Sequence, residues 1–346
     1  MLKIATGLCD CPARILRLCG ESSACATIRA RACLSERRRK LSKPLNPAPD
    51  IIGIGVCTVD YLVIVPRLPQ RNENMRARRF ARELGGLASI ALVAAARLGA
   101  RARLIARIGD DEAGAYIRAA LRKEGIDVSQ LLVEAGGESQ VSVIVVDEPS
   151  GDRSIMTRLP TSQRLAAGEL RREDFAAARV LFVDNCNAAT LQAAQWARAA
   201  GAHVLLDPSQ PYAEIAPLLE HVTVPIVPEA WARAWLPDQP PSAVAERLCQ
   251  QGAEIAIVTR GERGAVASWD GQTQSFPAFA VDVVDTTGAG DAYHGAFMYA
   301  LLQGWDVPRM ASFAAAVGAL NCRALGGRSA LPSLDEVERF LARSID

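Results

Sequence analysis

A run of small residues that leads into an acid is the part of this chain best suited to chemistry. Gly288, Ala289 and Gly290 carry little or no side chain, and Asp291 follows them at the start of an apolar helical pattern. The backbone N–H groups of such a run can converge on a charged oxygen, and the positive end of the following helix strengthens the attraction. Asp291 is then placed to accept a proton beside the anion. This order of residues predicts phosphoryl transfer to an alcohol, with Asp291 as general base and the 288–291 amides as anion hole.

A plainer interpretation is a glycine-rich turn that caps a helix, with Asp291 as an ordinary first-turn acid. A cap does not need three small residues before its acid, so the anion-binding interpretation is favoured. The chain contains no Gly-x-x-x-x-Gly-Lys-[Ser/Thr] loop, which excludes the usual P-loop for binding the phosphates.

The segment from Asp285 to Asp291 resembles the second signature of the ribokinase-like (PfkB) carbohydrate kinases, Asp-Thr-x-Gly-Ala-Gly-Asp. Gly85-Gly86, followed by Gly99 and Gly109, has the spacing of the family's first signature. The resemblance covers nearly everything after residue 49, and residues 277–284 and 319–332 look closest to the sulfofructose kinase and ketohexokinase branch. It implies an α/β, ribokinase-like three-layer sandwich with a mainly parallel central sheet and a small β lid. It also implies ATP and Mg²⁺ as cofactors, and K⁺ as a further candidate.

The substrate-binding candidates follow from the same resemblance. They are Asp60, Asn74, Gly85 and Gly86. A carboxylate can accept hydrogen bonds from two vicinal hydroxyls, and a Gly-Gly pair lets backbone approach a ligand closely. Family members place Asn where this chain has Ile90, and often at Leu87 as well, so the hydroxyl pattern of the acceptor is open. Asn74 and Cys186 stand where the sulfofructose kinase branch has its sulfonate-binding pair, which favours a neutral sugar or polyol.

The nucleotide-binding candidates are the glycine loop after an apolar run and one residue of the second signature. They are Thr259, Gly261, Gly264 and Thr286. The loop resembles the family's Thr-x-Gly-x-x-Gly segment, a weak motif taken alone. For metals, the resemblance suggests a monovalent cation near Asp285 and water-mediated Mg²⁺ near Glu229. Ala232 stands where many relatives carry a glutamate.

The elements that must position these residues alternate between strand and helix. Short apolar runs predict buried parallel strands at 51–56, 104–109, 180–183, 203–206, 225–227 and 255–259, and an Ala-rich helix spans 87–98. Ligands of such sheets bind at the carboxyl ends of the strands. Two segments, about 61–82 and 140–157, read instead as antiparallel strands of a lid outside the main sheet. Val141, Val143 and Val145 on one face of that lid predict a homodimer.

Residues 1–49 differ from the rest in composition. They contain ten Lys or Arg and three acidic residues, together with five of the nine cysteines of the chain. The segment ends in a proline-rich stretch at 44–49. We expect a disordered or dispensable extension before a kinase domain at 50–346. The whole chain has 39 basic and 38 acidic residues, so it lacks the field that would attract nucleic acid or a membrane surface. No apolar run long enough to span a membrane occurs, and the expected location is cytoplasmic.

The sequence leaves two other functions open. A nucleoside kinase would use the same base and anion hole. A non-catalytic protein that binds sugars or nucleotides on the kinase fold would explain Ile90, Leu87 and Ala232, although Asp291 argues against such a loss of activity.

Overall fold

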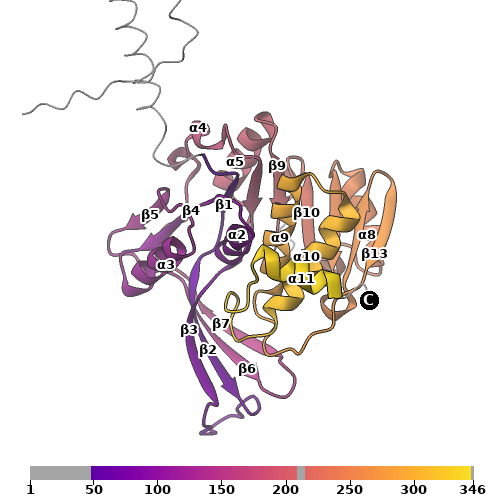
Figure 1. The fold of residues 1–346 in the computed structure, drawn as a ribbon. Helices are drawn as coiled ribbons and strands as arrows, with labels where there is room; N and C mark the ends of the chain where they lie inside the picture. The colour runs from indigo at the N-terminus through magenta and orange to yellow at the C-terminus, as the bar shows by residue number, and fades with distance from the viewer. Residues whose placement is uncertain (1–47, 209–214, 344–346) are drawn as a thin grey trace, which may run out of the picture. The chain divides into compact units, whose positions relative to one another are not determined.

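The central feature of the fold is a large sheet, seen in a computed structural model that describes residues 48–208 and 215–343 (Figure 1). Within these residues the sheet has nine strands in the order β13-β12-β11-β10-β9-β8-β1-β4-β5. The strands from β11 to β5 run parallel, and the β11–β12 and β12–β13 pairs are antiparallel. The strands are β1 (Ile51–Ile54), β4 (Ala102–Gly109), β5 (Leu131–Glu134), β8 (Val180–Val183), β9 (His203–Leu206), β10 (Val224–Pro228), β11 (Ile255–Thr259), β12 (Ala265–Trp269) and β13 (Gln272–Phe276).

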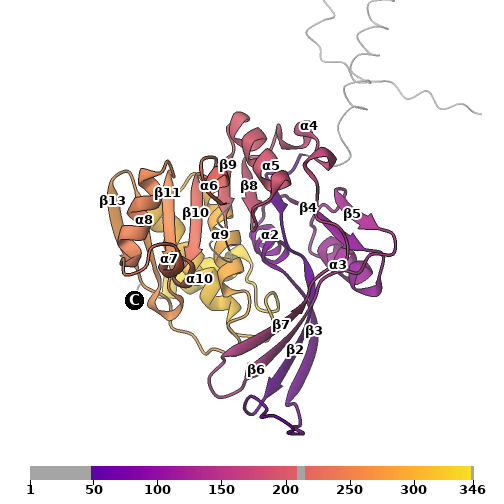
Figure 2. The ribbon, with the colours of Figure 1, turned by 180° about the vertical axis from the view of Figure 1, so that it is seen from behind.

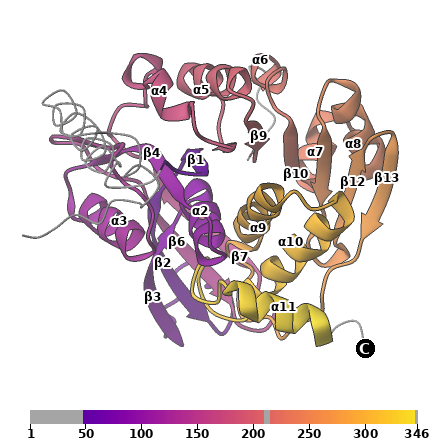
Figure 3. The same ribbon diagram turned by 45° about the horizontal axis from the view of Figure 1, so that its top comes forward.

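Helices cover both faces of this sheet, as Figure 3 shows for α5 and α6 on one side and α2 and α9 on the other. One layer contains α2 (Leu87–Arg97), α3 (Glu112–Lys123), α9 (Ala289–Gln303), α10 (Val307–Asn321) and α11 (Leu334–Arg343). The other contains α4 (Arg172–Phe175), α5 (Ala188–Ala199), α6 (Ala216–Leu219), α7 (Glu229–Trp235) and α8 (Pro241–Gln250). Short 3₁₀ turns occur at Ala167–Glu169 and Gly261–Arg263.

Neighbouring residues of each central strand belong to opposite cores. In β8, Val180 and Phe182 pack with α2 and α9, whereas Leu181 and Val183 pack with α5. A strand that is buried on both faces reads as a continuous apolar run, because successive side chains point to opposite sides of the sheet. This is why these strands could be predicted from continuous apolar runs, although polar and apolar residues do not alternate in them.

A second sheet of four strands, in the order β3-β2-β6-β7, forms the lid (Figure 2). Its strands are β2 (Thr58–Val65), β3 (Arg79–Gly85), β6 (Val141–Asp147) and β7 (Arg153–Arg158). The sequence predicted antiparallel pairing here. That holds for β2–β3 and β6–β7, but the central β2–β6 pair is parallel. Both strands lead out from the main sheet before the chain turns back, so they run in the same direction.

The two faces of the lid differ in burial. Leu62, Ile144 and Val146 are buried on one face and pack with Leu325. The opposite face exposes apolar side chains: Phe80 is 63% exposed and Met156 58%. Val143, which pairs with Met156, belongs to the same outer face.

The predicted parallel strands and the predicted helix are all confirmed, with ends that shift by three residues at most. Strands β5, β12 and β13 were not predicted. Of the predicted extension 1–49, only Ala48 and Pro49 lie within the described residues, so its dispensability stays a prediction. Among the described helices, none is long and apolar enough to cross a membrane.

Candidate active site

The candidate site lies where the parallel strands end and α9 begins. Asp184 directly follows β8, Asp207 directly follows β9, and Asp291 is in the first turn of α9. All three belong to the carboxyl edge of the main sheet, where loops of α/β proteins bind their ligands. Asp60 on the lid strand β2 is a fourth carboxylate, close enough to affect the pKa of Asp291.

The loop before α9 has the geometry that an anion site needs. Gly288 is the N-cap of α9 and adopts φ 72°, a left-handed conformation. A Cβ there would lie 2.6 Å from Gly327 Cα, so both the backbone angle and the space require glycine. Gly288 offers no side-chain cap, and the first-turn amides of a helix have no acceptor within it. The N–H groups of Gly290 and Asp291 are therefore at the positive end of a fifteen-residue helix.

Asp291 is electrostatically coupled to the other acids. Its pKa is raised to about 8, mainly by burial and next by Asp207; Asp184 and Asp60 also raise it, and His294 lowers it. Burial likewise raises the pKa of Asp207 to about 8 and that of Asp184 to about 6. A carboxyl whose pKa lies near neutrality can exchange a proton at physiological pH, as a general base must.

Asp60 and Gly85 form one unit across the β2–β3 hairpin. A Cβ on Gly85 would lie 1.9 Å from Asp60 Oδ2, so only glycine leaves room for this carboxylate. Asp60 is 6% exposed, and its Oδ1 has no hydrogen-bond partner. Burial raises the pKa of Asp60 to about 7. A buried oxygen without a partner is costly, and a hydroxyl of a bound ligand would satisfy it.

Gly86 begins α2 beside this unit. Its φ is 97°, and a Cβ would lie 2.5 Å from the carbonyl oxygen of Val56. Asp184 accepts hydrogen bonds from Val56 N at 2.7 Å and Ala88 N at 3.2 Å. Asp184 thus joins β8, the end of β1 and the first turn of α2. It caps a helix whose own N-cap residue has no side chain.

Asp285 holds the anion-hole loop in place through hydrogen bonds. It is fully buried, and its Oδ1 accepts from Thr287 N at 2.9 Å and Thr287 Oγ1 at 2.7 Å. Its Oδ2 accepts from Gly326 N at 2.8 Å. Both carboxylate oxygens are used by protein donors. The monovalent cation predicted near Asp285 stays a prediction, and backbone carbonyls would have to supply its ligands.

Three of the four nucleotide candidates lie at the end of β11. Thr259 ends this strand, Gly261 begins the 3₁₀ turn, and Arg260 N donates to Gly264 O at 2.8 Å. Gly264 has φ 78°, and a Cβ there would lie 1.9 Å from the carbonyl oxygen of Phe276. Glycine is thus required at Gly264 by the β12–β13 hairpin itself. Thr286, the fourth candidate, lies in the anion-hole loop and accepts a hydrogen bond from Arg153 of β7.

Glu229 faces this nucleotide loop. Its carboxylate pairs with Arg263 of the 3₁₀ turn and lies 3.9 Å from Arg233. In the part of the chain that the structure describes, no group of three or more His, Cys, Asp or Glu side chains is arranged to hold a metal ion. Mg²⁺ can be held mainly by substrate phosphates and water, and it then needs few protein ligands.

Three residues noted in the sequence lie apart from the acids. Asn74 is exposed in the loop that joins β2 to β3, and the structure does not bring it to the site. Ile90 is 1% exposed, and its side chain lies near Gly327. Leu87 is half-buried at the start of α2.

Sequence reasoning missed two acids, and a histidine of α9 lies beside one of them. Asp184 and Asp207 were not singled out, although each directly follows a predicted strand. His294 is 3% exposed, as expected for a packed helix residue, and burial lowers its pKa. Its Nδ1 lies 2.6 Å from Gly290 O and its Nε2 3.1 Å from Ile226 O, which ties α9 to β10. Nδ1 is also 3.6 Å from Asp207 Oδ2.

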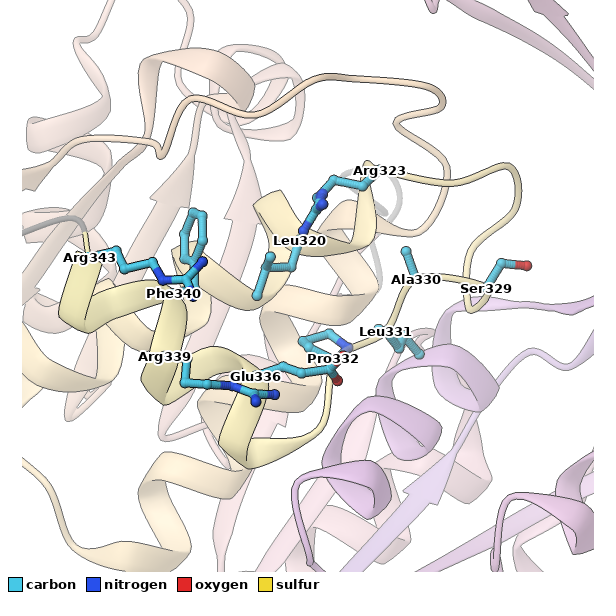
Figure 4. A pocket seen from close by; sticks show the side chains of 10 residues that line it. All are labelled: Leu320, Arg323, Ser329, Ala330, Leu331, Pro332, Glu336, Arg339, Phe340 and Arg343. Carbon is cyan, nitrogen blue, oxygen red and sulfur yellow. The ribbon is translucent and has the colours of Figure 1, made fainter.

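A separate hollow of about 540 Å³ lies between the end of α10, the following loop and α11 (Figure 4). Its lining includes Arg323, Arg339, Arg343 and Phe340 but none of the predicted site residues. The hollow is therefore separate from the acid cluster, which is the candidate active site.

Comparison with known proteins places this geometry in a family. Residues 49–334 match the pfkB family carbohydrate kinases. Ribokinase of Bacillus subtilis (strain 168) is 27% identical over 301 residues, which cover 85% of this chain and 99% of the relative. Fructokinase-1 of Oryza sativa subsp. japonica is 26% identical over 320 residues, which cover 84% and 97%.

Solved structures agree on the fold. Arabidopsis thaliana ribokinase, in a complex with ribose and ATP, superposes with a TM-score of 0.74 at 21% identity and covers 85% of this chain and 99% of its own. An E. coli protein assigned as ribokinase II, in a complex with ATP and Mg²⁺, gives a TM-score of 0.76 at 20% identity, with 85% and 99% covered.

The fold and the site together define a phosphotransferase that acts on an alcohol. The chain belongs to the pfkB family of carbohydrate kinases and has the ribokinase-like fold, as the sequence predicted.

Proposed function

We propose that this protein transfers the γ-phosphoryl group of ATP to a primary hydroxyl of a neutral sugar or polyol, with Asp291 as general base. The observation that carries the proposal is the position of Asp291. It stands in the first turn of α9, next to free amides, and its pKa is raised to about 8. Relatives named ribokinase and fructokinase support a sugar as acceptor.

The chain's own residues account for each part of the transfer. The acceptor oxygen attacks the γ-phosphorus while its proton passes to the Asp291 carboxylate. The bond between the γ-phosphorus and the β–γ bridging oxygen breaks, and ADP leaves with that electron pair. The 288–291 amides stabilise the charge on the transferring group, since they are already oriented by the helix and by Asp285. Mg²⁺ bound to the phosphates would neutralise charge on the nucleotide.

The acceptor end of the site favours a neutral molecule. The carboxyls of Asp60, Asp184 and Asp207 lie close enough to raise the pKa of Asp291, and Asp184 also raises the pKa of Asp207. A second anion brought among them would be repelled and would lack donors. Hydroxyls, in contrast, can donate to the partnerless Oδ1 of Asp60 and to Asp291. Asn74 would contact the acceptor only if the loop between β2 and β3 moved toward the site.

The nucleotide is proposed to extend from the anion hole toward the loop at Thr259, Gly261 and Gly264, with Thr286 beside its phosphates. The ATP complexes of two proteins with this fold support the cofactor. Glu229 is proposed to act on Mg²⁺ only through water, because Arg263 already pairs with its carboxylate.

A homodimer is proposed through the outer face of the lid, defined by Phe80, Val143 and Met156. These side chains are 63%, 37% and 58% exposed. A second copy of the chain, related by a two-fold axis, would cover this apolar face and the strand edges beside it.

The test of the proposed function is ADP release from MgATP over a panel of neutral pentoses, hexoses, polyols and nucleosides. Asp291→Asn keeps the size of the side chain and removes the base, and we expect turnover to fall by about 10²- to 10⁴-fold while nucleotide binding is kept. Equal turnover by the variant and the wild type would overturn the mechanism. Turnover on nucleosides alone would make the protein a nucleoside kinase.

A further inference from the structure

We infer that Arg153, on the first position of the lid strand β7, is a catalytic residue that contacts the transferring phosphoryl group. This inference rests on the proposed function and adds a cation to it. The Arg153 Nη1 group donates a hydrogen bond to Thr286 Oγ1, across 133 positions of the sequence. Thr286 lies two residues before Gly288, so the guanidinium stands at the entrance to the anion hole.

The lid touches this loop at a second point. Gly151, in the turn between β6 and β7, has φ 69°, and a Cβ on it would lie 3.6 Å from Val283 Cγ1. The turn at 148–152 and the start of β7 therefore rest on the segment 283–286. The position of Arg153 thus depends on the lid, while the anion hole belongs to the main sheet and α9.

Arg153 differs in its pairing from three other arginines of the lid. Arg67 pairs with Glu73, Arg78 with Glu148, and Arg158 with Glu138. In the described residues no carboxylate lies within salt-bridge distance of Arg153, and its side chain donates to a neutral hydroxyl. A guanidinium that is not neutralised can bind phosphate oxygens through several donors at once.

The chemistry of the site calls for such a cation. The anion hole consists of backbone amides, and the acids around it are Asp285, which holds the loop, and Asp60, Asp184, Asp207 and Asp291 on the acceptor side. As the bond from the γ-phosphorus to the bridging oxygen breaks and the bond to the acceptor oxygen forms, negative charge on the transferring group must be balanced. Arg153 would exchange the Thr286 hydroxyl for a phosphoryl oxygen, and no proton or electron pair moves to or from it.

The alternative roles of Arg153 predict other results. A residue that only ties the lid to the loop would affect stability and lid position. A residue that binds an anionic acceptor would affect the KM for the sugar. Stabilisation of the transferring group would lower kcat and leave both KM values nearly unchanged.

The experiment compares Arg153→Gln and Arg153→Lys with Arg79→Gln, a lid arginine that is exposed on β3 at the opposite edge of the lid. We expect Arg153→Gln to lower kcat by about 10²- to 10³-fold, at or below the lower end of the range for arginine residues that assist phosphoryl transfer. The KM values for ATP and sugar should stay within about threefold, and Arg153→Lys should recover part of kcat because it restores the charge. Arg79→Gln should equal the wild type.

Binding measurements give a readout that does not depend on turnover. Mg·ADP with aluminium fluoride and the sugar imitates the transferring group, whereas Mg·ADP alone does not. We expect Arg153→Gln to bind ADP as the wild type does. Aluminium fluoride increases the affinity for ADP, and this increase should be at least about tenfold smaller in the variant than in the wild type. If Arg153→Gln matches Arg79→Gln in kcat and in this increase, the inference fails while the proposed function stands. A wild type that transfers no phosphoryl group would overturn both.

Discussion

Individual glycines and acids decide what this site can hold. Gly85 makes room for the Asp60 carboxylate, and Gly288 makes room for Gly327. Gly290 is different, because a Cβ at this position would meet no protein atom within 4 Å. Packing therefore does not explain its lack of a side chain, whereas the proposed anion hole would. The three glycines separate the requirements of the fold from those of the reaction.

Gly290→Ala should reduce activity without harming the fold. Alanine is preferred over glycine in a helix by about 1 kcal/mol, so the melting temperature should stay equal or rise slightly. The added methyl group would enter the space proposed for the phosphoryl group, and kcat/KM should fall by about tenfold or more. Gly288→Ala is the control for a structural effect, and it should lower the melting temperature. Full activity of Gly290→Ala would contradict the placement of the anion hole.

The buried acids should make stability depend on pH in a defined direction. Asp207 keeps its proton in the folded protein up to about pH 8, whereas the unfolded chain loses it near the ordinary value of 3.8. Between these two values the folded state binds more protons, so its stability is greatest below the unfolded pKa and is lost as pH rises toward 8. Asp207→Asn removes this loss. Its melting temperature relative to the wild type should rise steadily from about pH 4 to pH 8. A constant difference would contradict the raised pKa.

At the scale of elements, the sequence predicted what local patterns determine. Continuous apolar runs located β1, β4 and β8 to β11, and the glycine-rich turn located the start of α9. Asp184 and Asp207 could have been found by noting that each directly follows a predicted parallel strand, because such ends line the ligand edge. The parallel β2–β6 pair could not be predicted, since pairing between distant strands leaves no local pattern. The position of Asn74 also depended on how a long loop is placed.

The loop before α9 is held by the Asp285 side chain, which accepts from Gly326 N, and by backbone hydrogen bonds from Val284 and Asp285 to Cys322. Asp285→Ala would leave two buried N–H groups and a hydroxyl without their acceptor, which should cost about 3 kcal/mol in the free energy of unfolding. Activity should fall even where the variant is folded, because the anion hole loses its fixed position. Asp306→Ala is the matched control: it removes the N-cap of α10 and should cost about 1 kcal/mol with full activity. Denaturant unfolding and kcat together would show whether the two variants differ in this way.

For the whole molecule, the domain is expected to be independent of residues 1–49. The family match begins at residue 49, and the first strand begins at Ile51. A truncated protein that begins at Pro49 should keep its melting temperature and its turnover. A large loss of either would mean that the extension contributes to the folded domain.

The lid dimer can be tested separately at the same scale. Phe80→Asp with Met156→Asp places two charges on the outer face of the lid, where the partner copy is proposed to pack. Light scattering should report a dimer for the wild type and a monomer for the double variant. A wild type that is monomeric at micromolar concentration would contradict the proposed assembly.

The central claim is that this chain moves the γ-phosphoryl group of ATP onto a neutral sugar hydroxyl by means of Asp291. Phosphorus NMR of MgATP with the best sugar of the panel follows that group directly. The account predicts that ADP and one phosphate monoester of a primary hydroxyl appear in equal amounts, and that Asp291→Asn slows both by about 10²- to 10⁴-fold. Release of inorganic phosphate without a sugar phosphate, or an unchanged rate in Asp291→Asn, would contradict it.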